Sequence, residues 1–146
     1  MTRYFTVKQA TELLPRVERR LRDALLAHRE YQRADEEFRE FQKRILMSGG
    51  AQVNREKVTQ IVASRGASAT ILKQEMAAIE EMGVQVKDLE VGLIDFPTLY
   101  RGQEVLLCWK FGEAAIEHWH GLTEGFRGRR PIDDEFLAEH RGEVEQ

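Results

Sequence analysis

Apolar residues recur every three or four positions through the first third of the chain, which is the spacing of one face of an α-helix. Between residues 6 and 47 this stripe consists of Leu14, Val17, Leu21, Ala24, Tyr31, Phe38 and Ile45. Thr6, followed three residues later by Gln9, has the form of a helix capping box, so the pattern predicts a helix that begins after Thr6. Pro15 lies inside this helix, where it predicts either a kink or a fresh start after a short first segment.

A second helical pattern predicts a helix from about Arg55 to Met82, with Asn54 as its N-cap and Gly83 at its C-terminal end. Its apolar stripe consists of Val58, Ile61, Val62, Ala69, Leu72, Met76 and Ile79. A turn at Gly49–Gln52 folds the two helices into an antiparallel hairpin. This register places Phe38 beside the small residues of the segment 64–68, where Gly66 is expected to leave room for the ring.

The chain from residue 84 onward has the short apolar runs and turn residues that are typical of β-strands. They predict strands at Val84–Val86, Val91–Ile94, Val105–Trp109 and Ile116–His120, with turns at Pro97–Gly102 and Phe111–Glu113. The segment Leu122–Ile132 is rich in Gly and Arg and is expected to be an ordered loop. A last helix is expected from about Asp134 to His140, capped by Asp133.

These elements predict an α+β fold in which a long antiparallel two-helix, coiled-coil-like hairpin packs at its base on a small antiparallel β-sheet. A length of 146 residues suits a single domain, 1–146. Within it, we assign residues 6–83 to the hairpin and 84–132 to the sheet with the Gly/Arg loop. Residues 133–146 form the short helix and tail.

Composition narrows the classes of partner. The net charge of −3 gives no reason to expect a nucleic-acid partner, and no segment approaches the roughly 20 apolar residues of a transmembrane helix, so no membrane partner is expected either. A single Cys cannot form an internal disulfide, which suits a reducing compartment. With no apolar run of signal-peptide length at the start, a cytoplasmic location is the expectation.

The residues suited to metal chemistry gather between positions 86 and 131, which contain the only Cys, both Trp and two of the four His. His118 and His120 share one face of a predicted strand, and one pairing register places Cys108 of the preceding strand opposite His118. Cys and His are zinc or iron ligands, and Asp95 is the better fourth ligand because Glu117 lies on the other strand face. Without a Cys-x-x-Cys or His-Glu-x-x-His pattern, the competing interpretation is favoured: a buried structural Cys108 and hydrogen-bonded histidines.

Arg127, Arg129 and Arg130 form a second candidate site, for an anion such as phosphate or a carboxylate. The competing interpretation is again structural and is favoured here too. In it Phe126 packs into the core and one of the arginines clamps Asp95 or another carboxylate of the chain. Trp109 and Trp119 are expected to stack on each other across the predicted hairpin.

Several segments resemble a known family. They are TRYFTVKQATELLP at residues 2–15, GLIDFP at 92–97, EVLLCW at 104–109, Trp119–His120, and GFRGRRP at 125–131. The chain is similar in these segments to the bacterial domain-of-unknown-function family 2203, a family of small uncharacterised proteins. The resemblance implies one intact domain, and it implies no established activity, cofactor or catalytic residue.

Two functions follow from these observations. The first is an uncharacterised cytoplasmic, non-enzymatic interaction or scaffold domain that self-associates, because Leu26 and Phe41 lie off the main stripe and offer a second packing surface. The expected partner is a second copy, as a homodimer, or another protein bound through the helices. The alternative is a metal- or anion-binding domain, with a hydrolase-like enzyme as one form of it, and with a divalent metal such as zinc near Cys108. The sequence identifies no catalytic residue.

Overall fold

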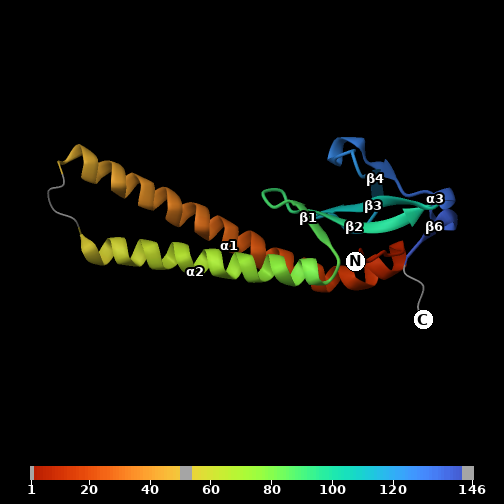
Figure 1. Cartoon of the computed structure of the whole chain (residues 1–146), viewed down its shortest axis with the longest axis horizontal. Coiled ribbons are helices and arrows are strands. Elements are labelled where there is room, and N and C mark those ends of the chain that lie inside the picture. Colours follow the sequence, from red (N-terminus) through yellow and green to blue (C-terminus); the bar gives the residue numbers. More distant parts are fainter. Residues whose placement is uncertain (1, 50–53, 143–146) are drawn as a thin grey trace. The chain divides into compact units, whose positions relative to one another are not determined.

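The computed structural model describes residues 2–49 and 54–142 and has the predicted α+β fold (Figure 1). Its helices are α1 (Val7–Met47), α2 (Arg55–Glu81) and α3 (Asp134–Glu139), and η1 (Phe126–Gly128) is a 3-10 turn. Its strands are β1 (Gln85–Asp88), β2 (Leu93–Tyr100), β3 (Gln103–Lys110), β4 (His118–Gly121), β5 (Arg130–Pro131) and β6 (His140–Arg141).

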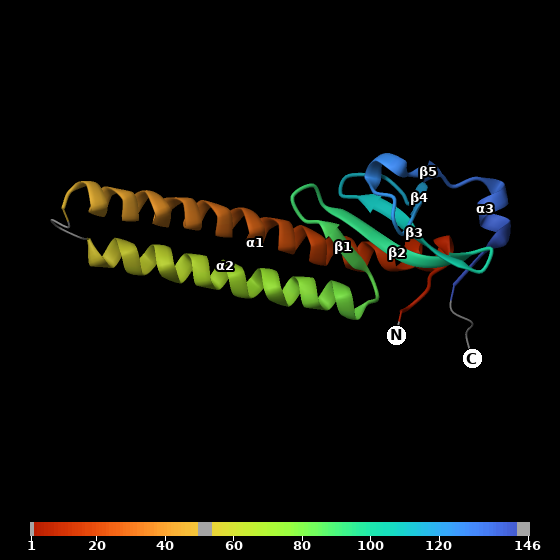
Figure 2. The ribbon, with the colours of Figure 1, turned by 45° about the horizontal axis from the view of Figure 1, so that its top comes forward.

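The chain divides into two compact units. One comprises residues 22–75, which are the distal parts of α1 and α2. The other comprises residues 1–21 and 76–146, and so contains the base of both helices together with the sheet. In Figures 1 and 2 the first turns of α1 run alongside the sheet within this second unit.

The predicted helix ends are confirmed in detail. The Thr6 hydroxyl accepts a hydrogen bond from the Gln9 backbone N–H at 3.0 Å, and the Gln9 side chain accepts one from the Thr6 N–H at 2.9 Å. Asn54 caps α2 through the Lys57 N–H at 3.1 Å, and Gly83 follows α2 with a φ of +88°. Because α1 is continuous through Pro15, there is no fresh start at that residue. Part of the predicted hairpin turn lies outside the described residues.

In the distal unit, one contact confirms the predicted helix register. Arg65 of α2 pairs with Asp35 of α1 at 3.2 Å and places its guanidinium 4.2 Å from the centre of the Phe38 ring. The proposed role of Gly66 is wrong, because this residue is exposed and a Cβ added to it would meet nothing within 4 Å. Arg65 therefore covers Phe38, and the glycine does not accommodate the ring.

Strand β2 is longer than predicted, because Pro97 lies inside it and not in the turn. Pro97 has no N–H group to donate. Proline is therefore tolerated in a strand where no neighbouring strand would accept a hydrogen bond from it. The pairing of β1 with β2 ends at Asp95, and the Pro97 carbonyl accepts the Phe5 N–H at 2.7 Å. The turn to β3 consists of Arg101 and Gly102 alone, at φ values of 52° and 79°. Two positive φ values are typical of a type I′ hairpin turn.

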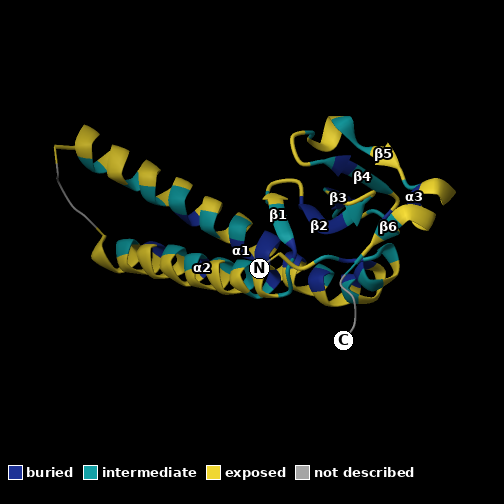
Figure 3. Cartoon of the chain, turned by 45° about the vertical axis from the view of Figure 1, so that its right-hand side comes forward, coloured by how far each residue is buried: buried dark blue, intermediate teal, exposed yellow. Residues whose placement is uncertain are grey.

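The sheet is antiparallel with the strand order β1-β2-β3-β4-β5, and β6 pairs with the far end of β2. Residues 93–98 of β2 and 105–109 of β3 are all buried, so both faces of these central strands are covered (Figure 3). On one face, Phe5 packs edge-on against Phe96 with ring centres 5.5 Å apart. The opposite face carries Asp95 and Cys108, because side chains alternate along each strand.

The predicted stacking of Trp109 on Trp119 is wrong. The strand register places Trp119 opposite Leu107, two residues from Trp109. Trp119 stacks instead on Phe136 of α3, and Trp109 meets Phe111 edge-on. Helix α3 itself begins as predicted, since the Asp133 side chain accepts the Phe136 N–H at 2.8 Å.

The capping box predicts that removing the Thr6 hydroxyl group lowers the stability of the fold measurably. Thr6→Ala removes the side-chain acceptor at the start of α1 and should lower the free energy of unfolding by about 1 kcal/mol in urea denaturation. Thr123→Ala, in an exposed loop, is the matched control and should change it by less than about 0.5 kcal/mol. Equal effects of the two substitutions would contradict the assigned cap.

Candidate metal centre

Three adjacent strands bring the candidate ligands to one face of the sheet. Asp95 of β2 lies opposite Cys108 of β3, and Cys108 lies opposite His118 of β4. Directly paired residues point to the same face, and so do residues two apart on one strand. His120 therefore shares this face as well. The sequence leaves the pairing register of β3 and β4 open, and in the structure Cys108 pairs with His118.

Asp95, Cys108 and His120 form a compact cluster. A carboxylate oxygen, the Cys108 Sγ and a ring nitrogen of His120 all lie within 4.8 Å of one another. The residues are 0%, 0% and 3% exposed, respectively. Asp95 Oδ1 is 3.0 Å from His120 Nε2, whereas Asp95 Oδ2 is buried without a hydrogen-bond partner among the described residues. A buried polar atom without a partner is rare in folded proteins, so it indicates a place for a ligand.

The hydrogen bonds fix where protons must lie. His120 Nδ1 is 2.9 Å from the Gly121 carbonyl oxygen, which can only accept, so Nδ1 carries a hydrogen. The contact between Nε2 and Asp95 then needs one further proton, on either the imidazole or the carboxyl group. Burial raises the pKa of Asp95, and His120 opposes this more weakly. The pair therefore holds a proton that a metal ion would replace.

The thiol of Cys108 is protonated at neutral pH. Burial, together with the nearby Asp95 carboxylate, raises its pKa to about 11, although Arg129 acts in the opposite direction. A thiol with so high a pKa is a poor nucleophile, which argues against cysteine catalysis. A bound metal would deprotonate it, since metals bind the thiolate form.

His118 faces the same side of the sheet but lies outside the cluster. Its Nδ1 is 3.9 Å from Glu113 Oε2, in the turn between β3 and β4, and has no hydrogen-bond partner within the described part of the chain. Glu113 receives two hydrogen bonds from Arg129, at 2.9 and 2.8 Å. This bidentate contact is the main cause that lowers the pKa of Glu113.

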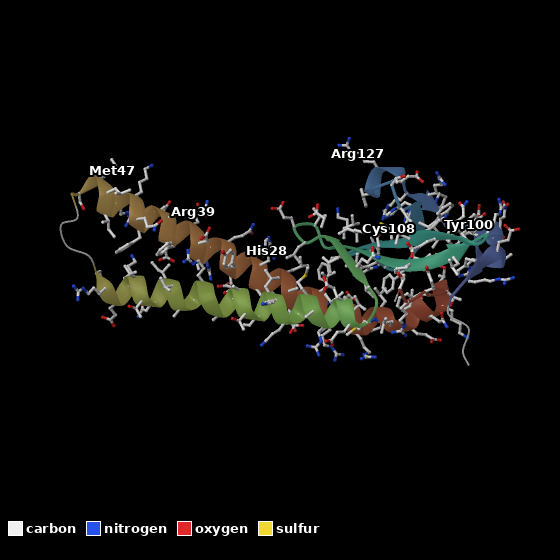
Figure 4. All side chains as sticks on the ribbon, in the orientation of Figure 1. His28, Arg39, Met47, Tyr100, Cys108 and Arg127 are labelled. Carbon is white, nitrogen blue, oxygen red and sulfur yellow. The ribbon has the colours of Figure 1, made fainter. Side chains whose placement is uncertain are left out.

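The three arginines of the second candidate site serve different contacts. Arg129 clamps Glu113, so a carboxylate of the chain is held as the structural interpretation predicts, although not Asp95. Arg130 pairs with Glu124 at 3.0 Å and lies over Trp119, on the other face of the sheet. Arg127 is exposed and extends from η1 (Figure 4). Anion binding by this loop stays a prediction.

Two residues near the arginine loop have roles that the sequence did not predict. Phe126 is 40% exposed and lies beneath Arg129 and Lys110, so the prediction that it packs into the core is wrong. Glu113 links the arginine loop to the turn before β4, and sequence reasoning missed it. The only available signal was its place in a predicted turn, where a carboxylate usually bonds a nearby backbone amide, as it does here to the Lys110 N–H at 2.7 Å.

A family profile described as an uncharacterized conserved protein, DUF2203, matches residues 3–132. The chain belongs to the DUF2203 family. All three residues of the cluster lie within the matched part of this DUF2203 protein. No curated protein and no solved structure gives a match. Among the described residues, no helix combines the length and the apolar character that crossing a membrane requires.

The raised pKa of Cys108 predicts how the stability of the metal-free protein depends on pH. The folded chain keeps the thiol proton to a higher pH than the unfolded chain, whose thiol has its ordinary pKa near 9. The contribution of the protonated thiol to the free energy of unfolding is therefore complete below pH 9, and it is lost as the pH rises from 9 toward 11. Between about pH 8 and pH 10 the thiol should remove about 1 kcal/mol from the free energy of unfolding.

Cys108→Ala tests this effect, because it removes the titrating thiol and changes no other residue. Urea unfolding at both pH values should show a smaller fall for the variant than for the wild type. Parallel falls would mean that the thiol is not buried as the structure places it.

Proposed function

We propose that this DUF2203 protein binds one transition-metal ion of the zinc class through Asp95, Cys108 and His120. The observation that carries the proposal is the buried cluster of oxygen, sulfur and nitrogen donors within 4.8 Å of one another. This donor set suits zinc, which binds thiolate, imidazole and carboxylate groups. The Asp95 carboxyl group supports it further, because without an ion this buried group has only the Cys108 thiol, a weak donor, beside His120.

The role best supported for this metal is structural. A dipositive ion would compensate a thiolate and a carboxylate at a place where neither charge is otherwise favourable. It would also tie β2, β3 and β4 together, and because the unfolded chain offers no such site, its binding would stabilise the fold. Three protein ligands leave a fourth position for water, but the near-complete burial of all three side chains favours a non-enzymatic role over hydrolase-like chemistry. A lone thiol suits a reducing, cytoplasmic location.

Metal analysis tests this proposal. Tag-free protein purified without chelator should contain close to one equivalent of zinc or a similar metal, and the variant Cys108→Ala/His120→Ala should contain almost none. His118→Ala is the matched control, because His118 shares the strand and face of His120 but lies outside the cluster, so this variant should keep its metal. A chelator should lower the melting temperature of the wild type and of His118→Ala only.

Two results would contradict the metal site. One is wild-type protein that stays metal-free after incubation with zinc. The other is loss of the metal in His118→Ala alone. Circular dichroism distinguishes a lost ligand from a failure to fold.

We also propose that the protein self-associates through the distal part of the hairpin, as a homodimer. Exposed apolar side chains support this: Leu46 and Met47, at the end of α1, are 81% and 80% exposed. Leu26 is also exposed on α1, as are Val62 and Ile71 on α2. Apolar side chains exposed together on one element are typical of a surface that binds another protein.

Light scattering tests self-association. The wild type should have twice the 16.9 kDa mass of one chain at micromolar concentration. The variant Leu46→Glu/Met47→Glu should shift the equilibrium toward the monomer with an unchanged melting temperature, because neither side chain is buried within one chain. Val91→Glu, exposed in the loop between β1 and β2, should remain dimeric. A monomeric wild type would overturn this proposal and leave the metal site unaffected.

A further inference from the structure

The last described segment, residues 133–142, lies against the rest of the chain as a strap. It contains α3 and β6, and it follows the residues 3–132 that match the family profile. Its strand pairs with the edge of β2 through only two residue pairs, Leu99 with Arg141 and Tyr100 with His140. The Thr98 hydroxyl adds a hydrogen bond to the Arg141 carbonyl at 3.1 Å. The strap thus extends the sheet in the manner of a bound peptide.

One aromatic ring anchors the strap. Phe136 is 1% exposed and stacks on both Tyr100 and Trp119, with ring centres 4.7 and 4.9 Å apart. Tyr100 and Trp119 belong to β2 and β4, and Figure 4 shows Tyr100 at the end of the sheet that adjoins the strap. Tyr100 and Trp119 also contact each other, with ring centres 5.2 Å apart, so the two form one aromatic surface on which Phe136 packs. A buried aromatic side chain of this kind is a typical anchor at a binding surface.

The strap also completes the start of α1. His140 Nε2 accepts the Val7 N–H at 2.9 Å, one of the backbone donors that a helix N-terminus leaves without an internal partner. Two residues on, a Cβ at Gly142 would lie 2.6 Å from the Thr6 nitrogen, so only glycine permits this close approach. Three residues of the strap therefore each make a different contact with the rest of the chain: Phe136, His140 and Gly142.

The rest of the strap packs loosely. Arg101, in the β2–β3 turn, pairs with Glu135 and Glu139 in exposed ion pairs, which contribute little to stability. A hollow of about 550 Å³ is lined by Leu99, Arg101 and Gly102 on one side and by Ala138, Glu139 and Arg141 of the strap on the other. The strap is held by one buried ring, two strand pairs and a few hydrogen bonds, so it opens at lower cost than the central strands, which are buried on both faces.

We propose that the edge of β2, the aromatic surface of Tyr100 and Trp119 and the start of α1 form a peptide-binding groove that accepts the strap of a second copy of this chain in place of its own. Exchange replaces each contact by an identical one, so it costs little enthalpy, and short identical segments are a common route to exchanged dimers. The groove selects a peptide with a short helical turn that carries an aromatic residue, followed by an extended segment with His at the fourth and Gly at the sixth position after the aromatic residue.

A peptide titration into the full-length chain tests the groove. The probe is a fluorescent synthetic peptide of residues 132–142, and binding is followed by anisotropy. Phe136→Ala in the protein weakens the internal strap and leaves the groove intact, so this variant should bind the peptide at least tenfold more tightly than the wild type does. A peptide that itself carries Phe136→Ala should bind at least tenfold more weakly than the unmodified peptide.

Leu137→Ala, at an exposed neighbouring position, is the matched control and should behave as wild type in both protein and peptide. If Phe136→Ala fails to fold, His140→Ala removes the acceptor of the Val7 N–H from the strap and should also bind the peptide more tightly than wild type. Binding no tighter than wild type in any folded strap variant would overturn the proposal, and so would equal binding of the two peptides. The peptide contains neither hairpin nor metal ligands, so the outcome is independent of both other proposals.

Discussion

The centre of the sheet places a carboxyl group, a thiol and an imidazole where no water reaches them. Their side chains are almost completely buried, and Asp95, Cys108 and His120 must therefore satisfy one another or a shared ligand. A buried carboxylate without compensation is strongly unfavourable, and a proton or a cation has to supply the missing positive charge. The proton held at the 3.0 Å contact between Asp95 and His120 supplies this charge in the metal-free chain, while Asp95 Oδ2 has no hydrogen-bond partner among the described residues.

This constraint explains why the strand register matters. A shift of one residue in β2 or β4 would move Asp95 or His120 to the opposite face, among Phe96, Leu107 and Trp119. The polar cluster thus distinguishes the correct pairing from the shifted one more sharply than apolar side chains could, since those are accepted on both buried faces. Arg129, fixed by Glu113, closes the polar region on the side of Cys108.

Local signals predicted local structure well. The caps at Thr6, Asn54 and Asp133 need only a short side chain and a backbone amide three residues away, and each forms as the sequence indicated. Features that depend on distant segments were not predictable in this way. Pro97 is accommodated in β2 because the pairing with β1 ends at Asp95, so no neighbour there requires its missing N–H. Its carbonyl instead accepts the N–H of Phe5, which is far away in sequence. Trp119 stacks on Phe136 because the strap folds back onto the sheet, and the residues around Trp119 in the sequence do not indicate this contact.

For the candidate site, too, the sequence predicted what depends on neighbouring residues and did not predict what depends on distant segments. Alternation along one strand placed His118 and His120 on the same face, because that inference needs only the strand period. Whether Cys108 and Asp95 share that face depends on the pairing register, which the sequence left open and the structure supplies. Alternation could not distinguish His120 from His118, which share the face but reach different neighbours: His120 turns to Asp95 and His118 toward Glu113.

X-ray absorption at the zinc edge of zinc-loaded protein tests the central claim most directly. The account predicts a first shell with one sulfur at about 2.3 Å, from Cys108, and nitrogen and oxygen neighbours at about 2.0 to 2.2 Å. A first shell of nitrogen and oxygen alone would show that zinc binds elsewhere on the chain and would contradict the account.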